Sequence, residues 1–178
     1  MSGEHVGVDD VRTDESRSAG DENLHRGVTL LQAEVVKAVR VPVPVSFVRD
    51  VLTRAAAVPE VAARLPSWPV TVAVRLTGDG ELQRLNRSYA GEDHATDVLS
   101  FAGSGDHLGD IAISWPATER QAAQFDHPAA TELALLSVHG LLHLLGWDHL
   151  TASERKEMSR LTRAALRCSG LTLARGRL

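Results

Sequence analysis

The sequence predicts a single α/β (α+β) domain in which a small mixed sheet of about four strands packs against helices. Two observations lead to this class: strand-like apolar stretches are interspersed with helical patterns, and one predicted helix is far more apolar than the others. That helix follows Pro128 and is expected to form the buried centre of the domain. The 178 residues are enough for one hydrophobic core but few for two.

Strand patterns occur in four segments. The second is the clearest, because Val70, Val72 and Val74 alternate on one face and Gly78 ends the run. The first has an apolar spacing that also fits a helix, so both interpretations stay open there. A loop rich in Gly and Asp joins the third and fourth segments and suits a hairpin. The four segments are residues 28–36, 70–76, 97–101 and 109–114.

Capping residues mark the expected helix boundaries. Ser46 is the expected N-cap of an early helix. Thr151 and Glu154 form a capping box for the last helix, which is expected to run to about Cys168. Gly146 is the expected C-terminal stop of the central apolar helix, so the candidate metal site described below lies on that helix and the following turn.

The two ends of the chain are expected to lie outside the domain. Residues 1–26 contain seven acidic residues, three arginines and no aromatic residue, so a disordered acidic extension is expected there. The domain itself is placed at residues 27–170 and a C-terminal tail at 171–178. Since the extension carries the whole net charge of −4, the domain is neutral and lacks the global basic signature of many nucleic-acid-binding proteins.

The composition also bears on the cellular compartment. Cys168 is the only cysteine, so no intrachain disulfide can form and a secreted disulfide scaffold is excluded. The chain does not begin with the apolar run of a signal peptide, and no stretch of about 18 apolar residues is present to span a bilayer. We therefore expect a cytoplasmic protein without a membrane partner.

Three histidines carry the strongest functional signal. His139 and His143 are four residues apart on the predicted central helix, so both imidazoles project from one face. Gly146 can adopt the left-handed conformation that turns the chain back and brings His149 to the same point. The spacing therefore predicts a site for one zinc ion per chain, held by His139, His143 and His149.

Three neutral ligands leave a fourth position on the ion open to water. A metal-bound water, with its pKa lowered to about 7, is therefore the expected catalytic group. The alternative is a closed structural zinc, for which Asp148, Cys168 or His127 would supply the fourth ligand. Asp148 has two further interpretations, because it can orient a ligand histidine or simply form the turn.

The offsets of the three histidines also match the metzincin proteases, whose motif is HExxHxxGxxH. In that motif the glutamate after the first histidine is the general base. Gly140 occupies this position here and carries no side chain. A zinc-dependent peptidase is therefore the less favoured alternative.

Three blocks of the sequence resemble the YbeY family of rRNA maturation endoribonucleases. The first is the histidine block, which reads H-G-x-L-H-L-x-G-Y-D-H in the family, with Trp147 here in place of the tyrosine. The resemblance extends over about residues 70–165, with the blocks in the same order. The blocks are His139–His149; Leu85-Asn86 with Tyr89, Gly91, Asp93 and Thr96–Phe101; and Leu108–Ile111 with Ile113-Ser114.

The resemblance implies a single-domain metalloprotein that binds zinc through the same three histidines. It further implies metal-dependent cleavage of single-stranded RNA in rRNA processing, at the 3′ end of 16S rRNA, and a part in ribosome quality control. The implied partners are single-stranded rRNA and the small ribosomal subunit or its proteins. DNA is not expected as a substrate.

One position departs from the family pattern. The family has Tyr-Arg-Gly before the Asp of the second block and places that arginine in the active site, whereas Ala90 stands here between Tyr89 and Gly91. Alanine cannot pair with a phosphate as a guanidinium does, so Arg87 or Arg84 is expected to supply the charge. Without such a charge, the alternative is a non-catalytic ribosome-assembly factor with a structural zinc.

Several other polar residues have two interpretations. Asp97 and Asp110 are expected to cap strand ends rather than to act as acids of a cleft, and His127 is expected to be a loop histidine. The last helix carries a basic cluster, which is either a solvated face or a contact for phosphate. This cluster consists of Arg155, Lys156, Arg160, Arg163 and Arg167.

Overall fold

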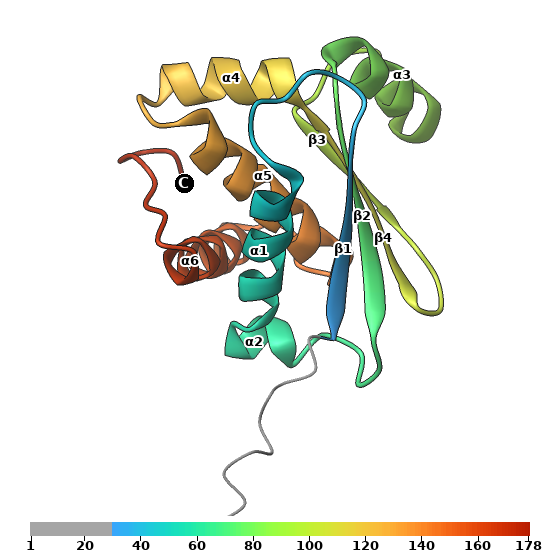
Figure 1. The fold of residues 1–178 in the computed structure, drawn as a ribbon, viewed down its shortest axis with the longest axis vertical. Coiled ribbons are helices and arrows are strands. Elements are labelled where there is room, and N and C mark those ends of the chain that lie inside the picture. Colours follow the sequence, from blue (N-terminus) through green and yellow to red (C-terminus); the bar gives the residue numbers. More distant parts are fainter. Residues whose placement is uncertain (1–29) are drawn as a thin grey trace, which may run out of the picture.

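Four strands form one mixed sheet in the computed structural model, which describes residues 30–178 (Figure 1). The order across the sheet is β1-β2-β4-β3; β1, β2 and β4 are parallel, and β3 runs antiparallel to β4. The predicted four-stranded mixed sheet and its hairpin are therefore confirmed, while the extension expected at residues 1–26 lies outside the described residues. The strands are β1 (Leu31–Lys37), β2 (Val70–Thr77), β3 (Val98–Ala102) and β4 (His107–Ser114).

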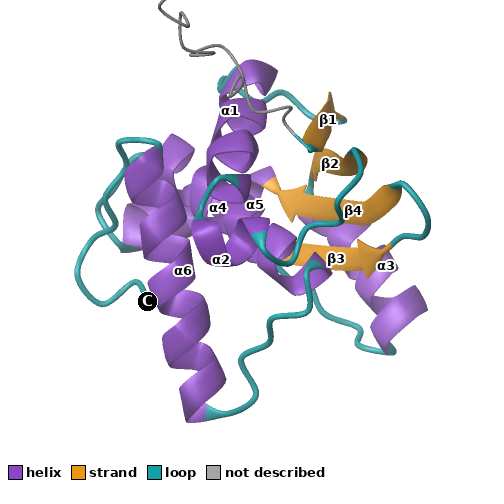
Figure 2. Cartoon of the chain, turned by 90° about the horizontal axis from the view of Figure 1, so that it is seen from below, coloured by secondary structure: helices purple, strands orange, loops and turns teal. Residues whose placement is uncertain are grey.

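Six helices surround this sheet. Figure 2 shows α1, α5 and α6 together on one side of it. On the opposite face, α3 and the outward side chains of β2 and β4 line a common hollow. Among residues 30–178, no helix is both long enough and apolar enough to cross a membrane. The helices are α1 (Val45–Ala56), α2 (Pro59–Ala62), α3 (Asp79–Ala90), α4 (Trp115–Gln124), α5 (Ala129–Leu144) and α6 (Ala152–Cys168).

The core lies between the sheet and α5. Alternate residues of β2, namely Val70, Val72 and Val74, are almost fully buried on the face that the helices cover. Helix α5 is buried on nearly all sides, as its apolar sequence predicts, because it packs against β3 and β4 and is flanked by α1, α4 and α6. Each fully buried aliphatic side chain contributes about 1.5–3 kcal/mol, so this layer holds α5 rigidly.

The structure settles one open alternative and corrects one boundary. The first segment is a strand, because Leu31 pairs in parallel with Val70 of β2. The predicted N-cap at Ser46 is wrong: α1 begins at Val45, and Pro44 is its N-cap without a side-chain hydrogen bond. Proline suits this place because its ring holds φ near −65°, and Pro44 has the extended conformation of an N-cap with φ −66° and ψ 148°.

The final helix begins as its sequence predicts. The Thr151 side chain accepts a hydrogen bond from the Glu154 backbone N–H, and the Glu154 carboxylate accepts one from the Thr151 N–H. After α6, the segment 171–178 folds back onto the domain, where Leu171, Leu173 and Leu178 pack against the core. The segment that was expected as a tail is thus part of the packed structure.

Candidate metal centre

Three histidines converge at the C-terminal end of α5. His139 and His143 lie one turn apart on this helix, and His149 lies in the loop that leads to α6. One ring nitrogen from each histidine lies within 4.8 Å of the other two, and the Nε2 atoms of His139 and His143 are 3.2 Å apart. Ligands at about 2.0–2.1 Å from a tetrahedral ion are about 3.3 Å from one another, so this pair already has the separation of two zinc ligands.

The turn after α5 brings His149 into place. Gly146 adopts φ 82°, a left-handed conformation that side chains with a Cβ rarely take. Its N–H donates to the His143 carbonyl at 2.9 Å, and the Trp147 N–H donates to the Leu142 carbonyl at 3.0 Å. These bonds close the helix and reverse the chain, as the glycine predicted.

Side chains on both sides of this loop hold it. The Asp148 Oδ1 atom accepts a hydrogen bond from the His149 N–H at 2.7 Å, and the Arg155 Nη1 atom donates to the His149 carbonyl at 3.1 Å. Trp147, which replaces the family tyrosine, is buried under the Arg64 guanidinium at 3.7 Å from the ring centroid. His149 is therefore anchored through its backbone and its neighbours, although its side chain is exposed.

The environment of two of these histidines disfavours their protonated form. Burial, and then the charges of His143 and His149, lower the pKa of His139 from 6.5 to about 4. Burial, and then the charge of His149, also lower the pKa of His143, against an opposing effect of Asp148. Only neutral imidazoles can ligate a metal, so protons compete weakly for these nitrogens near neutral pH.

The three imidazoles open onto a cavity of about 470 Å³. Its other wall is formed by β3 and the residues before it, including Thr96, Asp97 and Ser100. Within residues 30–178, no other group of three or more potential ligand side chains converges in this way, and neither a carboxylate nor a thiol belongs to the group. Three nitrogen donors beside an open cavity fit a divalent ion with room for an exchangeable ligand.

Asp97 is both a strand cap and an acid of the cleft, although the sequence analysis favoured the cap alone. Its Oδ1 atom accepts a hydrogen bond from the Val98 N–H at 2.9 Å, as a cap does. Its Oδ2 atom accepts a hydrogen bond from Gln121 Nε2 at 2.8 Å, and Asp97 lines the same cavity as His139. Local sequence could not show the second role, because α5 and β3 meet only in the tertiary structure.

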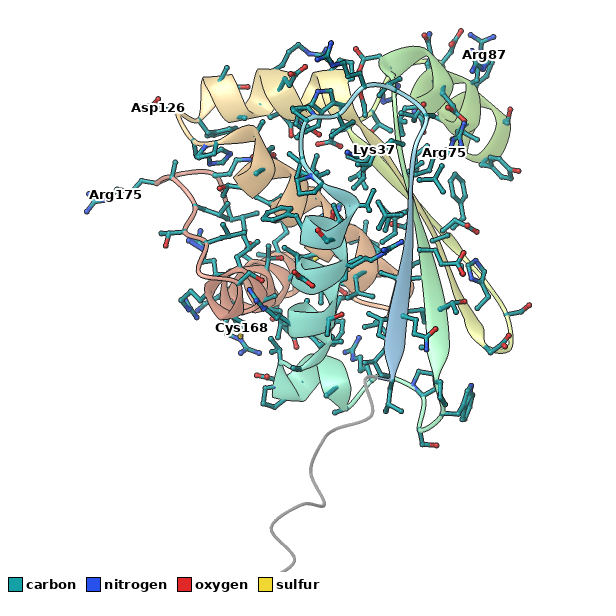
Figure 3. All side chains as sticks on the ribbon, viewed as in Figure 1. Lys37, Arg75, Arg87, Asp126, Cys168 and Arg175 are labelled. Carbon is teal, nitrogen blue, oxygen red and sulfur yellow. The ribbon has the colours of Figure 1, made fainter. Side chains whose placement is uncertain are left out.

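The structure separates two other candidates from the cavity wall. Arg87 points away from the body of the domain (Figure 3), is 59% exposed and donates to Asp93 Oδ1 at 2.6 Å. The Asp148 carboxylate bonds to the backbone of the turn, and it lies near enough to His143 to oppose the lowering of that pKa. Neither residue lines the cavity.

The alternative fourth ligands also lie elsewhere. Cys168 is exposed at the far end of α6 (Figure 3). His127 lies in the loop between α4 and α5, as expected, but its side chain is only 4% exposed and its Nε2 atom lies 2.6 Å from Glu132 Oε2. A closed structural zinc with either of these residues as fourth ligand is therefore not supported.

Glu132 is the centre of a buried polar cluster that the sequence analysis missed. This carboxylate is fully buried in α5 and bonds to His127 and to Arg177 of the folded-back segment. Arg177 Nη2 donates to Gln121 Oε1 at 3.1 Å, and Gln121 in turn bonds to Asp97. The cluster therefore connects the C-terminal segment to the cavity wall. The sequence does contain a signal for this cluster, because Glu132 is an acidic residue within the most apolar predicted helix.

Gly140 has a packing role. A Cβ at this position would lie 2.7 Å from the Ile111 Cγ2 atom and 3.1 Å from the Ser100 Oγ atom. The position thus faces the sheet, and the absence of a side chain allows α5 to approach β3 and β4. A glutamate in the place of the metzincin base would meet the sheet, which gives a structural reason against the peptidase alternative.

The lowered pKa values predict how acid affects the zinc-free protein. Between about pH 6.5 and about pH 4 the unfolded chain binds more protons than the folded protein, because His139 protonates more readily once exposed. Stability should therefore fall as the pH decreases through this range. Urea unfolding measured across this range tests this, with His139→Gln as the comparison. An equal loss of stability in both proteins would contradict the prediction.

Comparison with known proteins identifies a family. The sequence model of the family described as Endoribonuclease YbeY matches residues 40–170. A protein named Endoribonuclease YbeY from Roseiflexus sp. (strain RS-1) is 44% identical over 117 residues, which are 58% of this chain and 73% of that protein. Another protein of this name, from Moorella thermoacetica, is 41% identical over 140 residues, which are 71% of this chain and 86% of that protein.

A solved structure supports the fold. The solution structure of TM1509 from Thermotoga maritima has a TM-score of 0.53 and covers 76% of this chain and 90% of its own. At 21% sequence identity, this likeness shows a shared fold and nothing more specific.

Proposed function

Because the chain belongs to the endoribonuclease YbeY family, we propose that it is a zinc-dependent endoribonuclease that cuts single-stranded RNA. Its proposed role is in rRNA processing, where it would mature the 3′ end of 16S rRNA. The proposed partners are single-stranded rRNA and the small ribosomal subunit or its proteins. A part in ribosome quality control and a cytoplasmic location follow from the same substrate.

One observation carries the proposal: three imidazoles meet beside an open cavity. A structural zinc is normally enclosed by four protein ligands, whereas catalytic sites hold the ion with three and leave one position free. Imidazole donors favour zinc over magnesium or calcium, which prefer oxygen. The arrangement is therefore that of a catalytic centre.

The chain supplies binding, orientation and a proton acceptor. A zinc ion held by His139, His143 and His149 would supply Lewis-acid activation of water and of the phosphodiester. Burial of α5 keeps two of these ligands at fixed positions. Asp97 is the only carboxylate among the residues that line the cavity, and hydrogen bonds from Val98 and Gln121 orient it. We assign to its carboxylate the acceptance of the proton from the attacking hydroxyl.

The test is cleavage by the purified protein loaded with one zinc ion. A single-stranded fragment spanning the 3′ end of 16S rRNA should be cut, whereas the same sequence in a duplex should stay intact. Removal of the metal by a chelator should stop cleavage, and added zinc should restore it. If the protein with one bound zinc leaves the single strand uncut, the proposed activity is wrong.

Ala90 favours a second candidate function, that of a non-catalytic assembly factor that binds the small ribosomal subunit. The residue ends α3 at the place where the family has its active-site arginine, so no guanidinium extends from there. This candidate predicts a protein that binds the small subunit and zinc but cuts no RNA.

A further inference from the structure

A second hollow adjoins the histidines, because His139 and His149 are among the residues that line it. It measures about 260 Å³, and Arg155, Ser159 and Thr162 of α6 form its wall. His139 and His149 line both this hollow and the larger cavity beside β3. An extended strand that crosses the metal centre from the larger cavity would therefore continue along α6, with Arg155 beside it.

The guanidinium of Arg155 is positioned but only partly used. Its Nη1 atom donates to the carbonyls of His149 at 3.1 Å and of Leu150 at 3.0 Å. These two bonds fix the group beside the loop that carries a ligand histidine. A guanidinium has five N–H donors, and the three on Nη2 and Nε have no hydrogen-bond partner within residues 30–178.

The charge of Arg155 is also not neutralised by the acids near it in sequence. Asp148 accepts from the His149 N–H, Glu154 from the Thr151 N–H, and Glu157 from the Trp147 indole at 3.3 Å. In the described part of the chain, no carboxylate oxygen lies within 4.0 Å of the Arg155 guanidinium.

Other arginines near the site are paired with acids or, like Arg64, which lies over Trp147, line neither cavity. Arg87 is paired with Asp93, and Arg177 with the buried Glu132. On α6 itself, Arg160 is paired with Glu60 at 2.8 Å. Arg155 is thus distinguished by a fixed position at the histidines together with free donors and an unpaired charge.

We propose that Arg155 binds a phosphate of the RNA strand next to the metal centre and supplies the guanidinium that position 90 lacks. This inference rests on the proposed endoribonuclease function. A planar guanidinium with two free edges can form parallel N–H···O bonds to a phosphate, which lysine or alanine cannot. The charge that is absent at Ala90 in α3 is therefore provided from α6.

The first test measures binding rather than cleavage. A single-stranded 2′-O-methyl RNA, which lacks the free 2′-hydroxyl, is titrated with the zinc-loaded protein at several salt concentrations. Arg155→Gln should weaken binding by about tenfold, because one charge-assisted contact is lost. The slope of log affinity against log salt should also become shallower by about 0.7, the value for one phosphate contact with a single strand.

The matched control is Arg167→Gln, on the same helix. Arg167 is exposed near the C-terminal end of α6, and no carboxylate in residues 30–178 is paired with it. This variant should keep both the affinity and the salt slope of the wild type. If Arg155→Gln also keeps them, or if the wild type does not bind the strand, the inference is overturned.

Cleavage and zinc content separate this inference from the proposed function. Arg155→Gln should retain one zinc ion, and its kcat/KM on single-stranded RNA should fall by at least about tenfold. Arg155→Lys should recover part of this loss, because the charge returns without the bidentate geometry. A residue that only tethered the His149 loop would alter zinc content and leave the salt slope unchanged. If the wild type cuts no RNA while Arg155→Gln still shows the shallower slope, the proposed function fails and the phosphate contact stands.

Discussion

Replacement of His143 by alanine is expected to abolish stable zinc binding and to slow RNA cleavage by at least about 100-fold. Even residues that only support a metal ligand cost about 10–100-fold when they are changed, so the loss of a ligand should cost more. Two remaining histidines cannot hold the ion in the three-nitrogen geometry that the structure provides. The measurements are zinc content by mass spectrometry and the rate of cleavage of single-stranded RNA.

The matched control is His94→Ala. His94 lies outside the cluster, its side chain is 65% exposed, and it should be replaceable without effect on zinc or cleavage. The fold of the His143→Ala variant should persist, because alanine is the best helix former and His143 is only half-buried near the end of α5. If the purified His143→Ala variant cut the RNA as fast as the wild type, cleavage would not depend on the histidine cluster and the assignment of the site would be wrong.

Replacement of Glu132 by alanine should reduce the free energy of unfolding by about 3–5 kcal/mol, the usual cost of breaking a buried ion pair from one side. Glu132 is fully buried, and its partners His127 and Arg177 have side chains that are only 4% and 15% exposed. Without the carboxylate, the guanidinium stays in a poorly hydrated place or leaves it together with the C-terminal segment. Urea unfolding of the two proteins measures the difference.

Two comparisons make this result specific. Glu60→Ala breaks an ion pair with Arg160 at the surface and should leave stability nearly unchanged, since both side chains are about half-exposed. The double variant Glu132→Met, Arg177→Met should be more stable than Glu132→Ala, because neither charge then remains buried and unpaired. If Glu132→Ala is no less stable than Glu60→Ala, the buried pair does not stabilise the fold.

The sequence by itself predicted the features that depend on near neighbours. The histidine cluster is such a case: His139 and His143 are one helical turn apart, and Gly146 ends the helix so that His149 returns to the same place. The capping box of α6 is equally local, because Thr151 and Glu154 bond to each other across three residues. The mixed sheet followed from strand patterns and a hairpin loop, and the family blocks agree with the family match over residues 40–170.

Only the tertiary structure decided which distant residues share the site. Asp97 became an acid of the cleft because the start of β3 lies against α5, and Arg155 reached the histidines because α6 packs beside that helix. Arg87, a natural candidate by sequence, is paired with Asp93 outside the cavity. The physical reason is that such contacts join segments tens of residues apart. Whether such segments meet depends on the packing of the whole core, which no local sequence pattern shows. An example is the close approach of α5 to the sheet, which Gly140 permits.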